Sequence, residues 1–118
     1  MQIKNRKNLL IIYILSSFIF IFCLGAEEFN ITAKEIVIDK ENEIITGKGS
    51  VRATDSEGKL IDANKITYER SREFLLAEGD VKITDIEGNI LKTNKATYDK
   101  INELIITYDN TELILKEG

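Results

Sequence analysis

Two stretches of the sequence place carboxylates beside a glycine, and their residue types and spacing are the ones that most resemble a cation-binding site. They stand in Thr54-Asp-Ser-Glu-Gly58 and again in Thr84-Asp-Ile-Glu-Gly88. Calcium takes about six to eight oxygen ligands, and each stretch offers two carboxylates, so we predict no metal site. Because Asp bonds its own backbone and Gly permits a positive φ, each stretch predicts a hairpin loop of about three to five residues.

Nucleophilic and acid–base catalysis lack their usual residues in this chain. There is no histidine, and the single cysteine, Cys23, lies in an N-terminal apolar stretch. The other candidate groups are carboxylates on predicted turns and outward strand faces, so no nucleophile has an adjacent base. We therefore expect no enzyme activity and no cofactor.

The N-terminal stretch is typical of an export signal. Lys4, Arg6 and Lys7 precede an almost wholly apolar run from Leu9 to Leu24, which is shorter than the roughly 20 residues of a membrane span. We expect residues 1–26 to be a signal peptide cleaved after residue 25 or 26, with an uncleaved N-terminal anchor as the alternative. A lipoprotein signal needs a small residue before its cysteine, and Phe22 precedes Cys23.

The charge of the remaining chain excludes some classes of partner. Of the 16 Lys and Arg, three lie in the leader, so 13 remain against 20 Asp and Glu. The mature chain is thus acidic, which argues against nucleic acid or an anionic membrane surface as a partner. It also has no cysteine, so the predicted domain, residues 27–118, must be stable without a disulfide.

A thirty-residue repeat organises this domain. Residues 49–78 and 79–108 agree at 11 of 30 positions, and the same register extends upstream to Ile31 and downstream to Gly118. About three units therefore follow one another, and a period of this length indicates stacked units that bury their apolar faces only against neighbours.

Each unit predicts two strands of roughly ten residues. Between Glu73 and Ile83 the odd positions are mostly apolar or small, as in a strand with one buried face. Gly49 and Gly79 lie inside this pattern and predict a bend. In the strand that follows each acidic turn, the alternation of apolar residues shifts by one position, for example between Ala63 and Ile66. This shift predicts a β-bulge at Asn64-Lys65 and again at Asn94-Lys95.

Six such strands, antiparallel to their sequence neighbours, predict an all-β fold. Because the strands bend, we expect a curved antiparallel β-repeat, V-shaped or jelly-roll-like, whose two ends are open sheet edges. An unpaired edge is a template for pairing with another strand.

The repeat resembles the OstA domain of bacterial lipopolysaccharide transport. The resemblance rests on Ile61-Asp-Ala-Asn-Lys-Ile-Thr-Tyr68 followed by Leu75-Leu-Ala-Glu-Gly-Asp-Val-Lys-Ile83, and it covers residues 29–118. This domain is found in the periplasmic protein LptA and at the N-terminus of the outer-membrane protein LptD. The resemblance implies a taco-like sheet that holds lipid A acyl chains in an apolar groove and joins like domains through its edges.

We therefore expect a periplasmic lipid-binding bridge module with lipopolysaccharide and other OstA-like proteins, or a second copy, as partners. A sheet with one apolar face and no covering helix must close on itself or leave that face to a ligand. The alternatives are the N-terminal part of an LptD-like protein and a structural β-scaffold that carries no lipid. The predicted groove lining comprises Ile36, Ile38, Val51, Ile61, Ala63, Ile66, Tyr68, Leu75, Val81, Ile83 and Tyr98.

Lys65 and Lys95 have two interpretations. At the mouth of the predicted groove, their ammonium groups could meet the phosphates of lipid A. Alternatively, they are solvated lysines beside a β-bulge, a position that exposes side chains.

Overall fold

The chain folds as one antiparallel sheet of eight strands, which a computed structural model describes for residues 29–117. The predicted leader, residues 1–26, lies outside the described residues. Within the described part, the only helical element is a 3-10 turn, η1 (Arg70–Arg72), and no helix there is long and apolar enough to cross a membrane. The strands are β1 (Asn30–Thr32), β2 (Glu35–Asp39), β3 (Ile44–Thr54), β4 (Leu60–Glu69), β5 (Phe74–Thr84), β6 (Ile90–Asp99), β7 (Leu104–Tyr108) and β8 (Glu112–Ile114).

The all-β prediction is confirmed, whereas the predicted count of about six strands differs from the observed eight. The first and last strands of the repeat are each interrupted. β1 and β2 both pair with β3, and β7 and β8 both pair with β6. An edge strand has a neighbour on one side only, so fewer ladder bonds hold its backbone through the bend.

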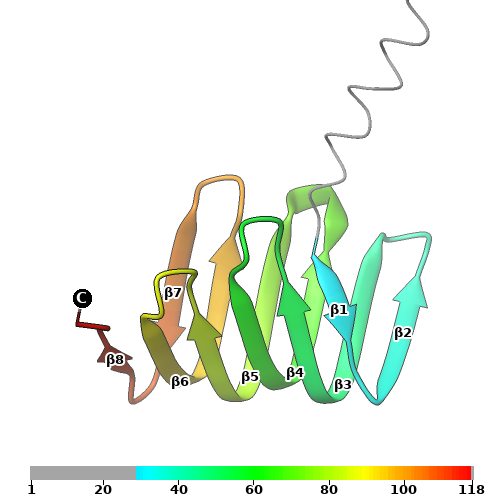
Figure 1. Ribbon diagram of the computed structural model, residues 1–118. Coiled ribbons are helices and arrows are strands. Elements are labelled where there is room, and N and C mark those ends of the chain that lie inside the picture. Colours follow the sequence, from blue (N-terminus) through cyan, green and yellow to red (C-terminus); the bar gives the residue numbers. More distant parts are fainter. Residues whose placement is uncertain (1–28, 118) are drawn as a thin grey trace, which may run out of the picture.

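The sheet bends into a V with two walls (Figure 1). The first wall contains β1, β8 and residues 51–54, 60–63, 81–84 and 90–93, and the second contains β2, β7 and residues 44–48, 65–69, 74–78 and 95–99. The walls meet at the bottom of Figure 1, and the hairpin turns lie along the top. We call the space between the walls the trough.

The bend arises from bulges on the glycine-containing strands. Two residues, Gly49 and Ser50, lie opposite one residue of β4, and Gly79 and Asp80 lie opposite one residue of β6. The prediction that placed the extra residue at Asn64-Lys65 and Asn94-Lys95 was therefore wrong about the strand. The phase slip is real, but the asparagine strand contributes the single residue, and the glycine strand contributes two.

Glycine suits this position for two reasons. Gly79 has a φ of +85°, which a side chain disfavours, and an added Cβ would lie 2.6 Å from Asn64 Nδ2. In the last unit Asp109 takes the equivalent place with a φ of +72°, which Asp tolerates better than most residues. The predicted bend at Gly49 and Gly79 is confirmed.

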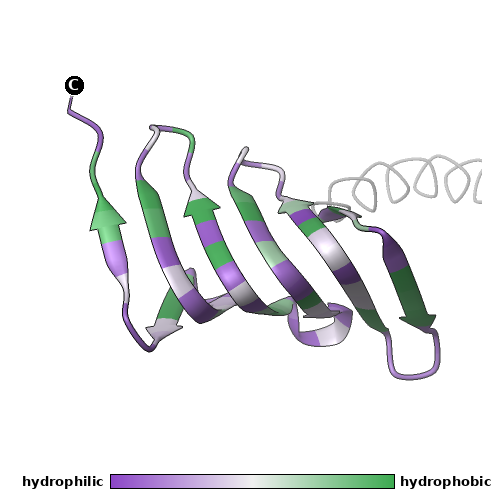
Figure 2. Ribbon diagram, turned by 90° about the horizontal axis from the view of Figure 1, so that it is seen from below, coloured by the Kyte–Doolittle hydropathy of each residue, from purple (hydrophilic) through white to green (hydrophobic). Residues whose placement is uncertain are grey.

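Apolar residues of both walls meet in the trough and form the core. Figure 2 shows apolar and polar bands alternating along the strands, as expected for a sheet with one buried face. Among residues 29–117, the buried apolar members of this core all come from β3 to β6. They are Val51, Ala53, Ile61, Ala63, Ile66, Tyr68, Leu75, Ala77, Val81, Ile83, Ala96 and Tyr98.

The two predicted acidic turns are confirmed as hairpin turns. Asp55 Oδ1 accepts hydrogen bonds from the backbone N–H groups of Glu57 and Lys59 at 2.9 and 2.8 Å, and Asp85 makes the same pair of bonds at 2.9 Å. Gly58 and its equivalent Gly88 have φ values of +90° and +95°. Within residues 29–117, no group of three or more potential metal ligands occurs.

Candidate apolar binding groove

The predicted lining residues lie in two different environments. Nine of them are 0–5% exposed in the core between the walls, where they contact other side chains, and of these nine Ile83 also lines the cavity at the C-terminal end. The other two, Ile36 and Ile38, are 43% and 62% exposed. They pair with Gly47 and Ile45, which puts them on the inner face of the second wall, but at this end only the three-residue β1 stands opposite.

Two aromatic contacts close the trough above its centre. The ring of Phe29 packs edge-on against Tyr68, with centroids 5.1 Å apart, and against Tyr98 at 5.8 Å. Lys59, at the start of the first wall, reaches across and donates from Nζ to the Tyr98 hydroxyl at 3.0 Å. Its ammonium also lies 4.4 Å from the Tyr98 ring centroid, a cation–π distance.

A buried ion pair joins the turns of the two walls beside these contacts. Lys100 Nζ lies 3.8 Å from Asp55 Oδ2, and the two side chains are 8% and 0% exposed. Within the described residues this carboxylate oxygen accepts no hydrogen bond, so the attraction is between charges alone. We call this ion pair, together with the Lys59–Tyr98 contact, the strap.

The trough is open at the C-terminal end. A cavity of about 300 Å³ lies there, and we call it the C-terminal groove. Its apolar wall is formed by inward side chains of both walls, and Leu113 is 60% exposed. The lining comprises Lys59, Ile83, Asp85, Asn89, Ile90, Leu91, Ile105 and Leu113.

Charges of both signs line the rim of the C-terminal groove. Partial burial disfavours the charge of Lys59, but the Tyr98 hydroxyl and the carboxylates of Asp55 and Glu57 outweigh this effect, so the pKa of Lys59 lies above its ordinary value. Hydrogen bonds from the Asn89 side chain and backbone lower the pKa of Asp85. Both groups are therefore ionised at neutral pH.

Lys65 and Lys95 lie away from the trough. Both are exposed beside the bend, and their strand neighbours in the ladder include Glu78. Lys95 Nζ also lies 5.4 Å from the ring centroid of Tyr108. The interpretation as solvated lysines beside a bulge agrees with this placement, whereas neither lysine is at the mouth of the trough.

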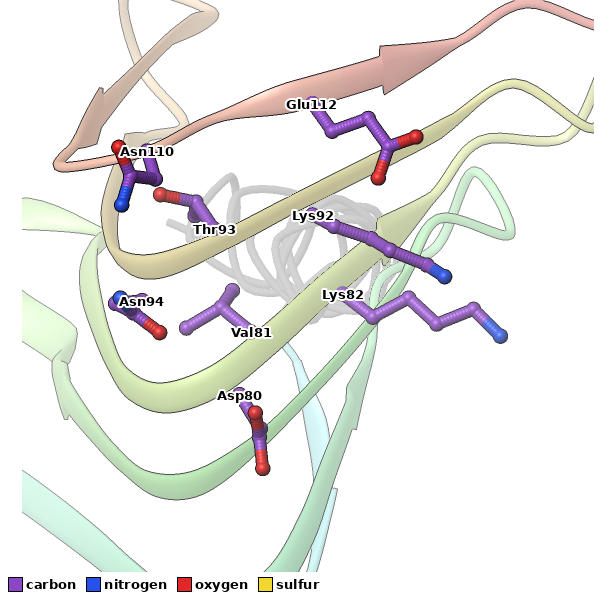
Figure 3. Close-up of a pocket in the computed structure, with 8 residues that line it drawn as sticks. All are labelled: Asp80, Val81, Lys82, Lys92, Thr93, Asn94, Asn110 and Glu112. Carbon is purple, nitrogen blue, oxygen red and sulfur yellow. The ribbon is translucent and has the colours of Figure 1, made fainter.

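A second cavity, of about 430 Å³, lies near the bend and is mostly polar (Figure 3). Lys82 and Lys92 are paired in the ladder and extend side by side, with Asp80 and Glu112 on either side of them (Figure 3). Because cations and carboxylates are mixed there and all four are exposed, this cavity has the character of a solvated surface.

The sequence analysis missed Phe29, Lys59 and Lys100 as residues that close the trough. The repeat contains a signal that could have found the first two. Phe29 and Lys59 occupy equivalent positions thirty residues apart, and each contacts the tyrosine 39 residues further on.

Comparisons with known proteins point to the fold alone. No known family profile matches the sequence, and no curated protein matches it. A solved structure, that of LptH from Pseudomonas aeruginosa, "the LptA homologous periplasmic component of the conserved lipopolysaccharide transport device", is similar with a TM-score of 0.50 at 11% identity. The match covers 77% of this chain and 96% of that chain. The expected resemblance is thereby confirmed at the level of structure: this chain has an OstA/LptA-like fold.

Proposed function

We propose that this protein is a non-enzymatic, periplasmic bridge module that shields lipopolysaccharide acyl chains during transport to the outer membrane. The observation that carries the proposal is the C-terminal groove, where the apolar inner face of the V remains uncovered. Each methylene buried there contributes about 0.8 kcal/mol, so acyl chains need no attraction to bulk charge. The similarity to a transport component, LptH, supports the same function.

In this proposal acyl chains bind at the ends of the trough before they enter its centre. The C-terminal groove accepts acyl chains directly, whereas the central trough is filled by its own side chains and closed by the strap. Lys59 lines this groove, and its ammonium, which bonds the Tyr98 hydroxyl, offers a cation to an anionic headgroup. Access to the centre requires the strap to open.

Partners and location follow from the same features. Export by the predicted leader places the protein in the periplasm. Strands β2 and β7 are edges of the sheet, and their backbone groups can pair with an edge of another OstA-like domain or of a second copy.

A structural scaffold without lipid is the second candidate function. The packed centre of the trough favours it, because residues such as Ile66 and Leu75 are at most 1% exposed and leave no room for acyl chains there. A scaffold would use the edges alone.

Substitutions at two adjacent positions on β7 distinguish the two candidate functions. Ile105 is half-buried on the inner face, whereas Ile106 is 43% exposed on the outer face. We expect Ile105→Asp to abolish binding of purified lipopolysaccharide and Ile106→Asp to retain it, with circular dichroism confirming that both variants fold. Absence of lipopolysaccharide binding by the unmodified protein would refute the lipid function and leave the scaffold as the remaining candidate.

A further inference from the structure

We infer that the strap is the closed state of a phosphate-binding site formed by the ammonium groups of Lys59 and Lys100. In the closed state Tyr98 and Asp55 occupy these two cations, and the phosphate of a lipid headgroup displaces them. This inference rests on the proposed lipid function and deepens it, because it names the charged group of the lipid that opens the centre of the trough and the residues that bind it.

The charged part of the strap holds two cations around one buried carboxylate. Lys100 Nζ lies 3.8 Å from Asp55 Oδ2, with both side chains buried. Lys59 lies at the other end of the same turn as Asp55, to which its backbone N–H donates at 2.8 Å, and the Asp55 carboxylate also attracts its ammonium. Glu57 adds a further attraction for Lys59, but Glu57 is exposed to solvent. Two positive charges thus face one buried negative charge, which leaves room for a further anion.

The contact between Lys100 and Asp55 is one that a phosphate can replace. Asp55 Oδ2 is buried and accepts no hydrogen bond within the described residues, and its distance of 3.8 Å from the ammonium exceeds the roughly 2.7–2.9 Å of a charge-assisted hydrogen bond. A phosphate oxygen offers Lys100 an opposite charge and a hydrogen bond together. Asp55 keeps its two turn bonds through Oδ1 when Lys100 leaves, so the turn survives the exchange.

Lys59 is held by a neutral partner and is the more accessible of the two cations. Its Nζ donates to the Tyr98 hydroxyl at 3.0 Å, whereas a phosphate monoester carries a charge of about −1.5 to −2 near neutral pH and attracts the ammonium more strongly. Because Lys59 lines the C-terminal groove, a headgroup at that groove meets it first. Tyr98 is then held over the trough by its ring contact with Phe29 and by other apolar contacts, which acyl chains can replace.

The strap lies where the trough is closed. Asp55 belongs to the turn between β3 and β4 and Lys100 to the turn between β6 and β7, so the ion pair joins the top edges of the two walls (Figure 1). In the next unit the equivalent carboxylate, Asp85, takes part in no salt bridge among residues 29–117. Its Oδ2 accepts a hydrogen bond from Asn89 Nδ2 of the same turn at 3.0 Å, and the C-terminal groove lies beside this turn. The ion pair therefore accompanies the closed centre, and the cavity lies where the described residues form no such pair.

Lipid A with and without its phosphates tests the phosphate site. We expect the unmodified protein to bind the phosphorylated form about tenfold more tightly than the dephosphorylated form, which is the factor that a hydrogen bond between charged groups supplies. Lys100→Met replaces the ammonium by an uncharged chain of similar length and should lose most of this preference. Lys95→Met removes an exposed charge away from the trough and should retain the preference.

The two partners of the ion pair should act in opposite directions. We expect Asp55→Asn to raise the affinity for phosphorylated lipid A by about tenfold, because Lys100 has lost its internal partner and a larger fraction of the molecules is competent to bind. A strap that serves stability alone would make Asp55→Asn and Lys100→Met change the affinity in the same direction, which would overturn the inference.

A neutral double variant keeps the test valid if a single variant unfolds. Each single substitution leaves a buried charge without its partner, whereas Asp55→Asn combined with Lys100→Met removes both charges and costs the fold less. With circular dichroism confirming that it folds, the double variant should bind dephosphorylated lipid A and show little preference for the phosphorylated form. A double variant that keeps the full preference would overturn the inference.

The outcomes separate this inference from the proposed function. Equal binding of the two lipids by the unmodified protein would refute the phosphate site but not the lipid function, which Ile105→Asp measures separately, and binding of neither lipid would refute both. Inorganic phosphate is the third probe, and we expect no saturable binding at millimolar concentration, because Lys100 is buried until acyl chains part the walls. Saturable binding that Lys100→Met removes would overturn the lipid headgroup as the source and indicate a site for free phosphate.

Discussion

Neutralising Asp55 should destabilise the fold far more than neutralising its repeat equivalent Asp85. Both carboxylates make the same two turn hydrogen bonds through Oδ1, and an asparagine keeps an acceptor oxygen for them. Only Asp55 faces Lys100, at 3.8 Å with both side chains buried. At that separation the attraction is roughly 4 kcal/mol for an effective dielectric constant of about 20, before desolvation is subtracted.

We expect Asp55→Asn to lower the free energy of unfolding by about 3 kcal/mol, because it leaves the Lys100 ammonium buried without its counter-charge. Asp85→Asn is the matched control for the turn and should cause a much smaller loss. Urea unfolding followed by circular dichroism measures both values, at a protein concentration where the chain is monomeric. Equal losses for the two variants would show that the turn, and not the strap, accounts for the stabilisation.

Two further predictions concern the bend and the turns. Gly79→Ala should lower the free energy of unfolding by about 2 to 3 kcal/mol, because a side chain disfavours its φ of +85° and the new Cβ meets Asn64. Gly58→Ala, at a position with a similar φ but only ordinary contacts, should lower it by about 1 kcal/mol in the same urea assay. Equal losses for the two variants would contradict the role of the close approach to Asn64. Hydrogen bonds from Asn102 lower the pKa of Asp99 below its ordinary value of 3.8. The stabilisation of the fold by the Asp99 carboxylate is therefore present above that value and is lost as the pH falls through the folded-state pKa. Asn102→Ala should flatten the loss of stability below about pH 4 in acid titrations, and an unchanged slope of stability against pH would refute this.

The sequence predicted the strands and turns well because both are encoded locally. Alternation of apolar residues with period two predicts a half-buried strand, and the Asp and Gly of each acidic turn specify its hydrogen bonds and its positive φ. The repeat then predicted the antiparallel order. The location of the bulge was wrong because a phase slip in β4 is visible in the sequence, whereas the register against Gly49-Ser50 depends on the neighbouring strand.

The state of the trough was harder to predict because it depends on contacts between distant segments. Asp55 and Lys100 read separately as a turn residue and a surface cation, and only the bend of the sheet brings them together. Phe29 precedes the first strand, where no periodicity assigns it to the core. A sequence pattern identifies an inner apolar face but does not say which part of that face the chain fills with its own side chains.

Photo-crosslinking at neighbouring positions of β7 would test the proposed lipid function most directly. A photoreactive residue is placed at Ile105, at Ile106 as the outward control, and at Ile66 in the packed centre, and the exported protein is irradiated and probed for lipopolysaccharide. We predict a light-dependent lipopolysaccharide adduct at Ile105 and none at Ile106, with an adduct at Ile66 only when the strap opens. Folded protein that gives no adduct at Ile105 would contradict the lipid function and leave the edge-to-edge scaffold.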